Sequence, residues 1–219
     1  MMLSLTAPTR RRLLWLSLFT LAMAQLEAAV VVYLRNIYYP DGFEFPLAII
    51  YDRMAAIEIG REAATVLMFF ALAKLYSAND RWRQYAAFLW AFGLWDILYY
   101  VWLWIMLGWP SSLLDIDVLF LIPLPWIGPV LAPIIISLVM MGAAWAIFSL
   151  RDHDRTILVT RPEWGITVGG AVALIALFMS DATAVVAGAM PRPFHWLLFG
   201  LFLLLPLIAA WRAYRRSRQ

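Results

Sequence analysis

The sequence has no cysteine, only two histidines and few charged residues among its 219 positions. Without cysteine the chain has no disulfide, no thiolate metal ligand and no cysteine nucleophile. Zinc-protease, Walker and Gly-x-Ser-x-Gly motifs are also missing. In the topology argued below, His153 and His195 fall on opposite sides of a membrane, so this chain is not expected to hold a haem between two histidines. The sequence therefore predicts no cofactor and favours a protein that is not an enzyme.

Apolar residues are correspondingly abundant. They make up 64% of the sequence, and charged residues make up 14%. Soluble domains average about 45–50% apolar and about 25% charged residues. The sequence thus predicts an integral membrane protein, and its length suits a single domain over residues 1–219.

Six apolar runs are long enough for membrane-spanning helices, which need about 20 residues each. We expect these helices at 13–34, 47–75, 85–107, 126–150, 164–186 and 194–211. The connections between them are short, so no separate soluble domain is expected. The predicted fold class is an all-α bundle of six transmembrane helices.

The basic residues predict how this bundle is oriented. Thirteen of them precede the first run, lie in or beside the second and fourth connections or follow the last run, whereas three lie on the other side. Cytoplasmic segments are enriched in Lys and Arg, so both termini are expected in the cytoplasm, in a bacterial-type inner membrane. An alternative is a signal peptide cleaved after the Ala-Met-Ala triplet at 22–24. The apolar run continues beyond that triplet to full spanning length, which favours an uncleaved first helix.

The net charge of +3 comes from these arginine clusters, which act as topology signals. Nucleic acid is therefore not an expected partner. The expected partners are the lipid bilayer and either further copies of this chain or a larger membrane complex.

The connection at 108–129 is too apolar for an ordinary loop and is broken by four prolines. We expect a re-entrant or interfacial segment around 109–125 that lies against protein, because its backbone needs hydrogen-bond partners. The alternative is an amphipathic stretch lying on the surface. Asp115 and Asp117 lie in its middle and are expected to be solvated.

Several ionisable residues lie inside the apolar runs. Glu27 lies in the first run, Glu58, Arg61 and Glu62 lie in the second, and Asp96 lies in the middle of the third. A charged group at the centre of a bilayer costs about 2.5–3.5 kcal/mol on insertion scales, so such groups tend to face the bundle interior. A helix rises 1.5 Å per residue, which brings the four carboxylates to similar depth. We therefore expect one pocket that opens toward the external side.

Spacing along the helices adds two details. Glu58 and Glu62 are four residues apart and share a helix face, which Arg61 borders. Tyr99 and Tyr100 likewise share a face with Asp96 and are secondary candidates for the site.

Two further secondary candidates, Asp181 and His195, lie near the outer ends of the last two runs, where interfacial polar residues are common. One arginine cannot neutralise four carboxylates. At least one of the four acids is therefore expected to be protonated, to be paired with a bound cation or to contact water.

Three hypotheses for function remain open. The first is a site that binds or moves protons, a cation or a small polar solute, with Glu58 and Glu62 as titrating ligands, Asp96 as partner and Arg61 as counter-charge. Carboxylates alone can also hold a hard metal cation. The second hypothesis is a non-catalytic subunit or assembly factor, in which these charges are architectural. The third is a membrane enzyme that acts on a lipid or isoprenoid by carboxyl acid–base chemistry.

Overall fold

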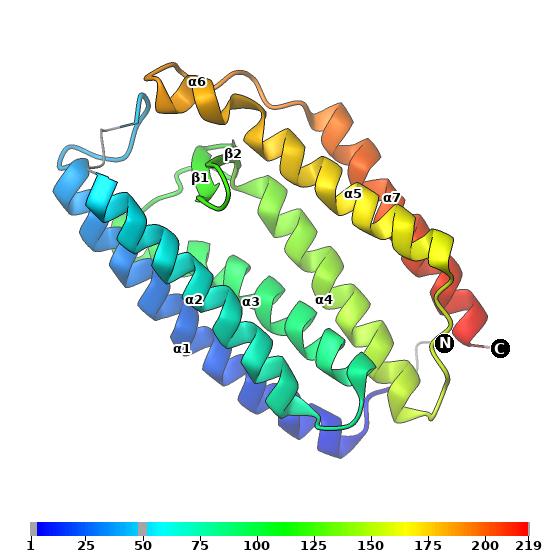
Figure 1. Cartoon of the computed structure of the whole chain (residues 1–219). Helices are drawn as coiled ribbons and strands as arrows, with labels where there is room; N and C mark the ends of the chain where they lie inside the picture. The colour runs from blue at the N-terminus through cyan, green and yellow to red at the C-terminus, as the bar shows by residue number, and fades with distance from the viewer. Residues whose placement is uncertain (1–3, 48–51, 219) are drawn as a thin grey trace.

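The computed structural model describes residues 4–47 and 52–218 (Figure 1). Long helices dominate this part of the chain. They are α1 (Ala7–Tyr38), α2 (Asp52–Tyr76), α3 (Arg81–Leu107), α4 (Leu131–Asp152), α5 (Arg161–Phe178) and α7 (Trp196–Ser217). A 3-10 turn, η1 (Met179–Asp181), and the short helix α6 (Ala182–Val186) connect α5 to α7.

Successive long helices run in alternating directions, and both termini lie at the same end of the molecule (Figure 1). Five of the described helices, α1, α3, α4, α7 and α5 with its continuation to Val186, are long and apolar enough to span a membrane. Helix α2 is continuous, but its apolar sequence is interrupted in its first half by the charged residues Glu58, Arg61 and Glu62. The second predicted run also includes 48–51, which lie outside the described residues.

Polar caps explain why several helices are longer than their apolar runs. The side chain of Asp80 accepts hydrogen bonds from the backbone N–H groups of Trp82 and Arg83, so α3 begins at Arg81 rather than at residue 85. That helix ends at Leu107 and is capped by Gly108, whose φ of +67° is a left-handed conformation that favours glycine. Thr160 and Glu163 form a capping box that starts α5.

The proline-rich segment corrects the all-α prediction. It forms an antiparallel hairpin of β1 (Ile116–Phe120) and β2 (Trp126–Pro129), and α4 consequently begins at Leu131 instead of residue 126. Proline lacks the N–H that a helix interior needs, which disfavours extending α4 backward over this segment. The hairpin lies against protein, as expected, because Asp117 and Ile127 are buried.

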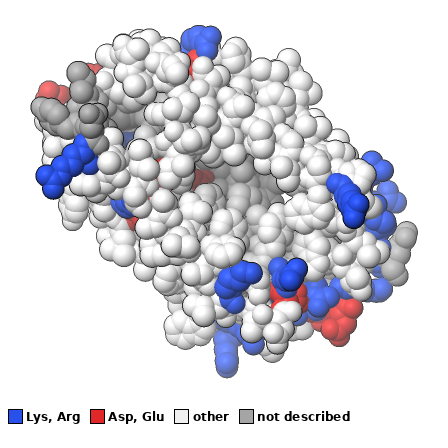
Figure 2. All heavy atoms as spheres, viewed as in Figure 1, with Lys and Arg blue, Asp and Glu red and all other residues white. Residues whose placement is uncertain are grey.

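A close contact between α3 and α4 positions the middle of the bundle. Gly93 of α3 lies so near α4 that an added Cβ would be 2.8 Å from the carbonyl oxygen of Ser137. On the other side of α3 lie α1 and α2, and Phe69 of α2 and Phe148 of α4 are fully buried in the shared core. The face in Figure 2 is largely uncharged across its middle and hollowed at its centre, with most charged residues toward its ends.

Candidate functional site

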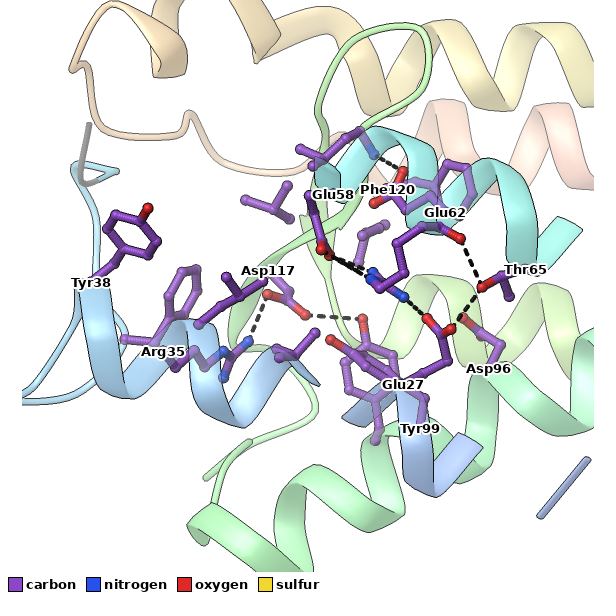
Figure 3. Close-up of a pocket in the computed structure, with 18 of the residues that line it drawn as sticks. Glu27, Arg35, Tyr38, Glu58, Glu62, Thr65, Asp96, Tyr99, Asp117 and Phe120 are labelled. Atoms are coloured by element: carbon purple, nitrogen blue, oxygen red, sulfur yellow. Dashed lines mark hydrogen bonds and ion pairs between the residues drawn. The ribbon is translucent and has the colours of Figure 1, made fainter. Parts of the chain in front are cut away.

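A cavity of about 160 Å³ lies where α1, α2 and α3 meet the hairpin, toward the end of the molecule opposite the termini. Acidic side chains from four elements line it (Figure 3). These are Glu27 of α1, Glu58 and Glu62 of α2, Asp96 of α3 and Asp117 of β1.

Arg61 is the centre of the inner charge network. Its guanidinium pairs with Glu27 on α1 and with Glu58 one turn earlier on α2. The hydroxyl of Thr65, one turn later on α2, donates to the carboxylate of Glu27 at 2.7 Å. Glu27 is thus held by two side chains of α2, Arg61 and Thr65. These contacts attach α2 to α1.

A second ion pair lies at the hairpin side of the cavity. The guanidinium of Arg35, at the end of α1, donates to Asp117 at 3.0 Å, and both side chains are buried. The hydroxyl of Tyr100 donates to the other oxygen of Asp117 at 3.3 Å. The rings of Phe43 and Trp109 lie 4.3 and 3.7 Å from the guanidinium carbon of Arg35, within cation–π range. This cluster attaches β1 to α1 and α3.

The two remaining carboxylates have neutral partners. Glu62 accepts a hydrogen bond from the backbone N–H of Leu121 at the turn of the hairpin, at 2.8 Å. Asp96 accepts a hydrogen bond from the hydroxyl of Ser137 on α4, also at 2.8 Å. Within residues 4–47 and 52–218, no ion pair joins either carboxylate to a basic side chain.

The cavity therefore holds more acid than base. Its lining contains five carboxylates and two guanidiniums, Arg35 and Arg61. Both guanidiniums are already paired with other acids, so Glu62 and Asp96 are the two acids of the described lining that have no basic partner. The rings of Trp95, Tyr99 and Phe120 form part of the remaining wall.

The structure brings the main sequence candidates together. Glu27, Glu58, Arg61, Glu62 and Asp96 all line this cavity, and so do the secondary candidates Tyr99 and Tyr100. Helical periodicity explains why residues three or four apart on α2 and on α3 face the same cavity.

The other secondary candidates, Asp181 and His195, lie apart from the cavity, near the connection between α5 and α7. Arg192 donates to Asp181 through its backbone N–H at 2.9 Å and through its guanidinium at 2.6 Å. Asp181 is therefore part of a local ion pair in this connection.

Sequence reasoning missed Arg35, Thr65 and Asp117. Asp117 was expected to be solvated, and this is wrong because its residue is only 3% exposed. Its partner Arg35 is 82 positions away in the sequence, and no local spacing signals such a pair. Asp115 is less buried and accepts hydrogen bonds from the backbone N–H groups of Ser111 and Ser112.

Within the part of the chain that the structure describes, no three histidine, aspartate or glutamate side chains are placed to hold a metal ion together. The lining is suited to binding a positive charge through ion pairs and hydrogen bonds from separate helices.

A larger and mostly apolar groove of about 340 Å³ lies between α3, α4, α5 and α7. Trp82, Tyr85 and Trp164 surround one end of it with ring contacts. Among the described residues, no acidic or basic side chain lines this groove. Of these two cavities, only the smaller one therefore offers charged groups to a ligand.

Comparisons with protein-family profiles, with curated proteins and with solved structures find no match to this chain. The geometry of the cavity is therefore the feature of this chain that points to a function.

Proposed function

We propose that this chain is a multi-pass membrane protein that binds a cation in the acidic cavity. The supporting observation is that Glu62 and Asp96 face the cavity without a basic partner in the described structure. An isolated carboxylate in apolar surroundings is costly, so it binds a proton or acquires a counter-ion. A cation that enters the cavity supplies the missing positive charge.

The contacts suggest a separate role for each acid. Glu58 is engaged by Arg61, so we now assign it to the inner charge network instead of the cation. Glu62 on α2 and Asp96 on α3 are the proposed ligands, and they approach the cation from two helices. Arg61 pairs with both Glu27 and Glu58, which leaves Glu62 and Asp96 as the acids without a basic partner in the described structure.

We further propose that α2 is the sixth transmembrane helix. Glu58, Arg61 and Glu62 line the cavity rather than the lipid-facing side, which lowers the cost of placing them in a bilayer. The alternating directions of the long helices support this topology. Both termini are then cytoplasmic in a bacterial-type inner membrane, the hairpin is re-entrant, and the cavity opens externally.

A flux assay in liposomes tests this function. The purified protein is reconstituted with a trapped pH indicator, and sodium, potassium or small ammonium salts are added across a pH gradient. We expect at least one cation to give a protein-dependent signal that Glu62→Gln and Asp96→Asn each reduce by about tenfold or more, because each removes a buried charge partner. Equilibrium binding of the same cations detects a site that binds without transport.

Glu44→Gln is the matched control, because Glu44 is exposed and lies outside the cavity. This variant is expected to behave like the unmodified protein. Full binding and flux in both Glu62→Gln and Asp96→Asn would refute the assignment.

A specific contact also favours an architectural role as a second candidate function. Arg61 joins α2 to Glu27 of α1, and such pairs fix the packing of membrane helices. The chain would then be a non-catalytic subunit or assembly factor. Purification in mild detergent separates the two functions, since a stoichiometric partner protein supports the architectural role and a cation-binding isolated chain supports the first proposal.

A further inference from the structure

The cavity contains an unsatisfied hydrogen-bond donor as well as surplus acid. Trp95 lines the cavity and is only 7% exposed. Its indole Nε1–H is buried and has no acceptor among the residues that the structure describes. Buried donors without an acceptor are rare in folded proteins, and each one calls for an explanation. An oxygen atom on a bound molecule would provide the acceptor.

The aromatic part of the wall favours a particular kind of cation. The ring of Trp95 lies 6.2 Å from that of Tyr99, and Phe120 lines the same cavity. Aromatic faces attract organic ammonium groups, and desolvated sites strengthen this attraction. The apolar stem of an organic ammonium compound also packs against rings, whereas a small metal ion keeps a hydration shell that the rings do not replace.

The size of the cavity limits the part of the ligand that it can enclose. Its volume is about 160 Å³. An apolar cavity of about 150 Å³ in another protein binds benzene, so there is room here for a compound of similar size. A single metal ion would leave most of this space unfilled.

We propose, building on the cation site proposed above, that the cavity takes a small organic ammonium compound that also carries a hydroxyl or carbonyl oxygen. The ammonium group lies against Glu62 and Asp96, and the oxygen accepts the hydrogen bond from Trp95. The same chemistry occurs in free amino alcohols and in amine-bearing lipid headgroups.

Calorimetric titration of the full chain in detergent, at constant ionic strength and without amine-bearing lipid, tests this proposal. The probes are ethanolamine, ethylammonium, ethylene glycol and sodium ion. Ethanolamine is expected to bind about tenfold more tightly than ethylammonium, because only its hydroxyl satisfies the buried indole donor. Ethylene glycol lacks the charge and sodium lacks the organic stem, so both are expected to bind more weakly still.

Trp95→Phe isolates the contribution of the indole. This variant keeps an aromatic ring but removes the N–H group. The affinity for ethanolamine is therefore expected to fall to the affinity for ethylammonium, and the affinity for ethylammonium is expected to stay unchanged. Trp104→Phe is the control, because Trp104 lies on the same helix and is 61% exposed. If Trp95→Phe fails to fold, the comparison of ethanolamine with ethylammonium on the unmodified protein still decides the matter.

The outcomes separate this inference from the proposed function. If sodium binds as tightly as ethanolamine and Asp96→Asn abolishes both, the cation site stands and the organic ligand is wrong. Equal binding of ethanolamine and ethylammonium would refute the role of the oxygen. If no cation binds, both proposals fail.

Nanodiscs identify the source of the ligand. If phosphatidylethanolamine competes with free ethanolamine and phosphatidylglycerol does not, the lipid headgroup enters the cavity. If neither lipid competes while free ethanolamine binds, the ligand is a soluble amine. Both results support a ligand that carries an ammonium group and an oxygen atom.

Discussion

Arg61 pairs with two acids, one on its own helix and one on α1. Its neighbours in the sequence indicate only the first of these pairs. Glu58 lies one turn away and could be predicted as a partner from spacing alone. Glu27 could only be predicted to lie at similar depth, since the sequence does not show which helices are neighbours. The contacts of Asp117 were missed entirely because they depend on how the hairpin folds back onto α1 and α3.

Replacing Arg61 with glutamine is expected to destabilise the protein. The change leaves the buried Glu27 and the partly buried Glu58 without their counter-charge, and removing one partner of a buried ion pair costs about 3–5 kcal/mol. We expect a lower unfolding temperature in detergent. Arg53→Gln is the control, since Arg53 lies on the same helix and is exposed.

The double variant Glu27→Gln/Arg61→Gln tests the mechanism of that loss. Removing one of the stranded acids together with the arginine should restore part of the stability. A double variant that is as unstable as Arg61→Gln alone would contradict this explanation.

At the scale of elements, the cavity depends on how closely helices approach one another. Gly93 lets α3 contact α4 tightly, and Ser137 at that contact donates to Asp96. The long helices could be predicted from the lengths of the apolar runs in the sequence. Five of the six predicted spans correspond to described helices that are long and apolar enough to cross a membrane. The hairpin could not be predicted, because its pairing depends on contacts with α1 and α2 that no local pattern reports.

Gly93→Ala is expected to separate α3 from α4. The new methyl group would be 2.8 Å from a backbone oxygen that cannot rotate away, and overpacking of this kind costs about 1–3 kcal/mol. Gly142→Ala on α4 is the matched control, because nothing lies within 4 Å of a Cβ at that position. Thermal unfolding should show a loss for Gly93→Ala only, and an equal effect of the two changes would contradict the close contact.

The start of α3 is expected to be sensitive to acid. Burial by itself raises the pKa of Asp80, but hydrogen bonds from Arg151 and from the backbone N–H groups of Arg83 and Trp82 outweigh it, so the pKa lies below its ordinary value. A depressed folded-state pKa contributes stability above the unfolded-state value of about 3.9, and this contribution is lost as the pH falls through the folded-state pKa.

Unfolding measured between pH 7 and pH 3 checks this expectation. Asp80→Asn should be less stable than the unmodified protein at pH 7, and the difference should shrink in the acid range. Asp41→Asn serves as the control because Asp41 lies in an exposed turn. A difference between Asp80→Asn and the unmodified protein that stays constant across this range would count against the hydrogen-bonded cap.

At the scale of the whole molecule, the alternating helices place the connections at two opposite ends (Figure 1). The mean composition and the basic clusters were enough to predict a membrane protein, and the described helices agree with that class. The sequence could not show that the cavity also contains a fifth carboxylate, Asp117, and a second arginine, Arg35, which pair with each other. Those residues come from segments whose positions depend on the complete fold.

The cysteine-free sequence allows a direct test of the proposed topology. Single cysteines at Asp41, Asn79 and Asp154 place one thiol before α2, one after α2 and one after α4. An impermeant maleimide added to oriented vesicles should label position 41 on one side and positions 79 and 154 on the other. Labelling of 41 and 79 from the same side would show that α2 does not cross the membrane.

Carbodiimide protection tests whether Glu62 and Asp96 hold a cation. Dicyclohexylcarbodiimide, an apolar reagent for carboxyl groups, is applied to the purified protein with and without choline, and the modified peptides are identified by mass spectrometry. We predict that Glu62 or Asp96 is modified, that choline slows this modification, and that modification of the exposed Glu44 is unchanged. Modification of Glu62 and Asp96 at the same rate with and without choline, sodium or potassium would contradict the proposed cation site.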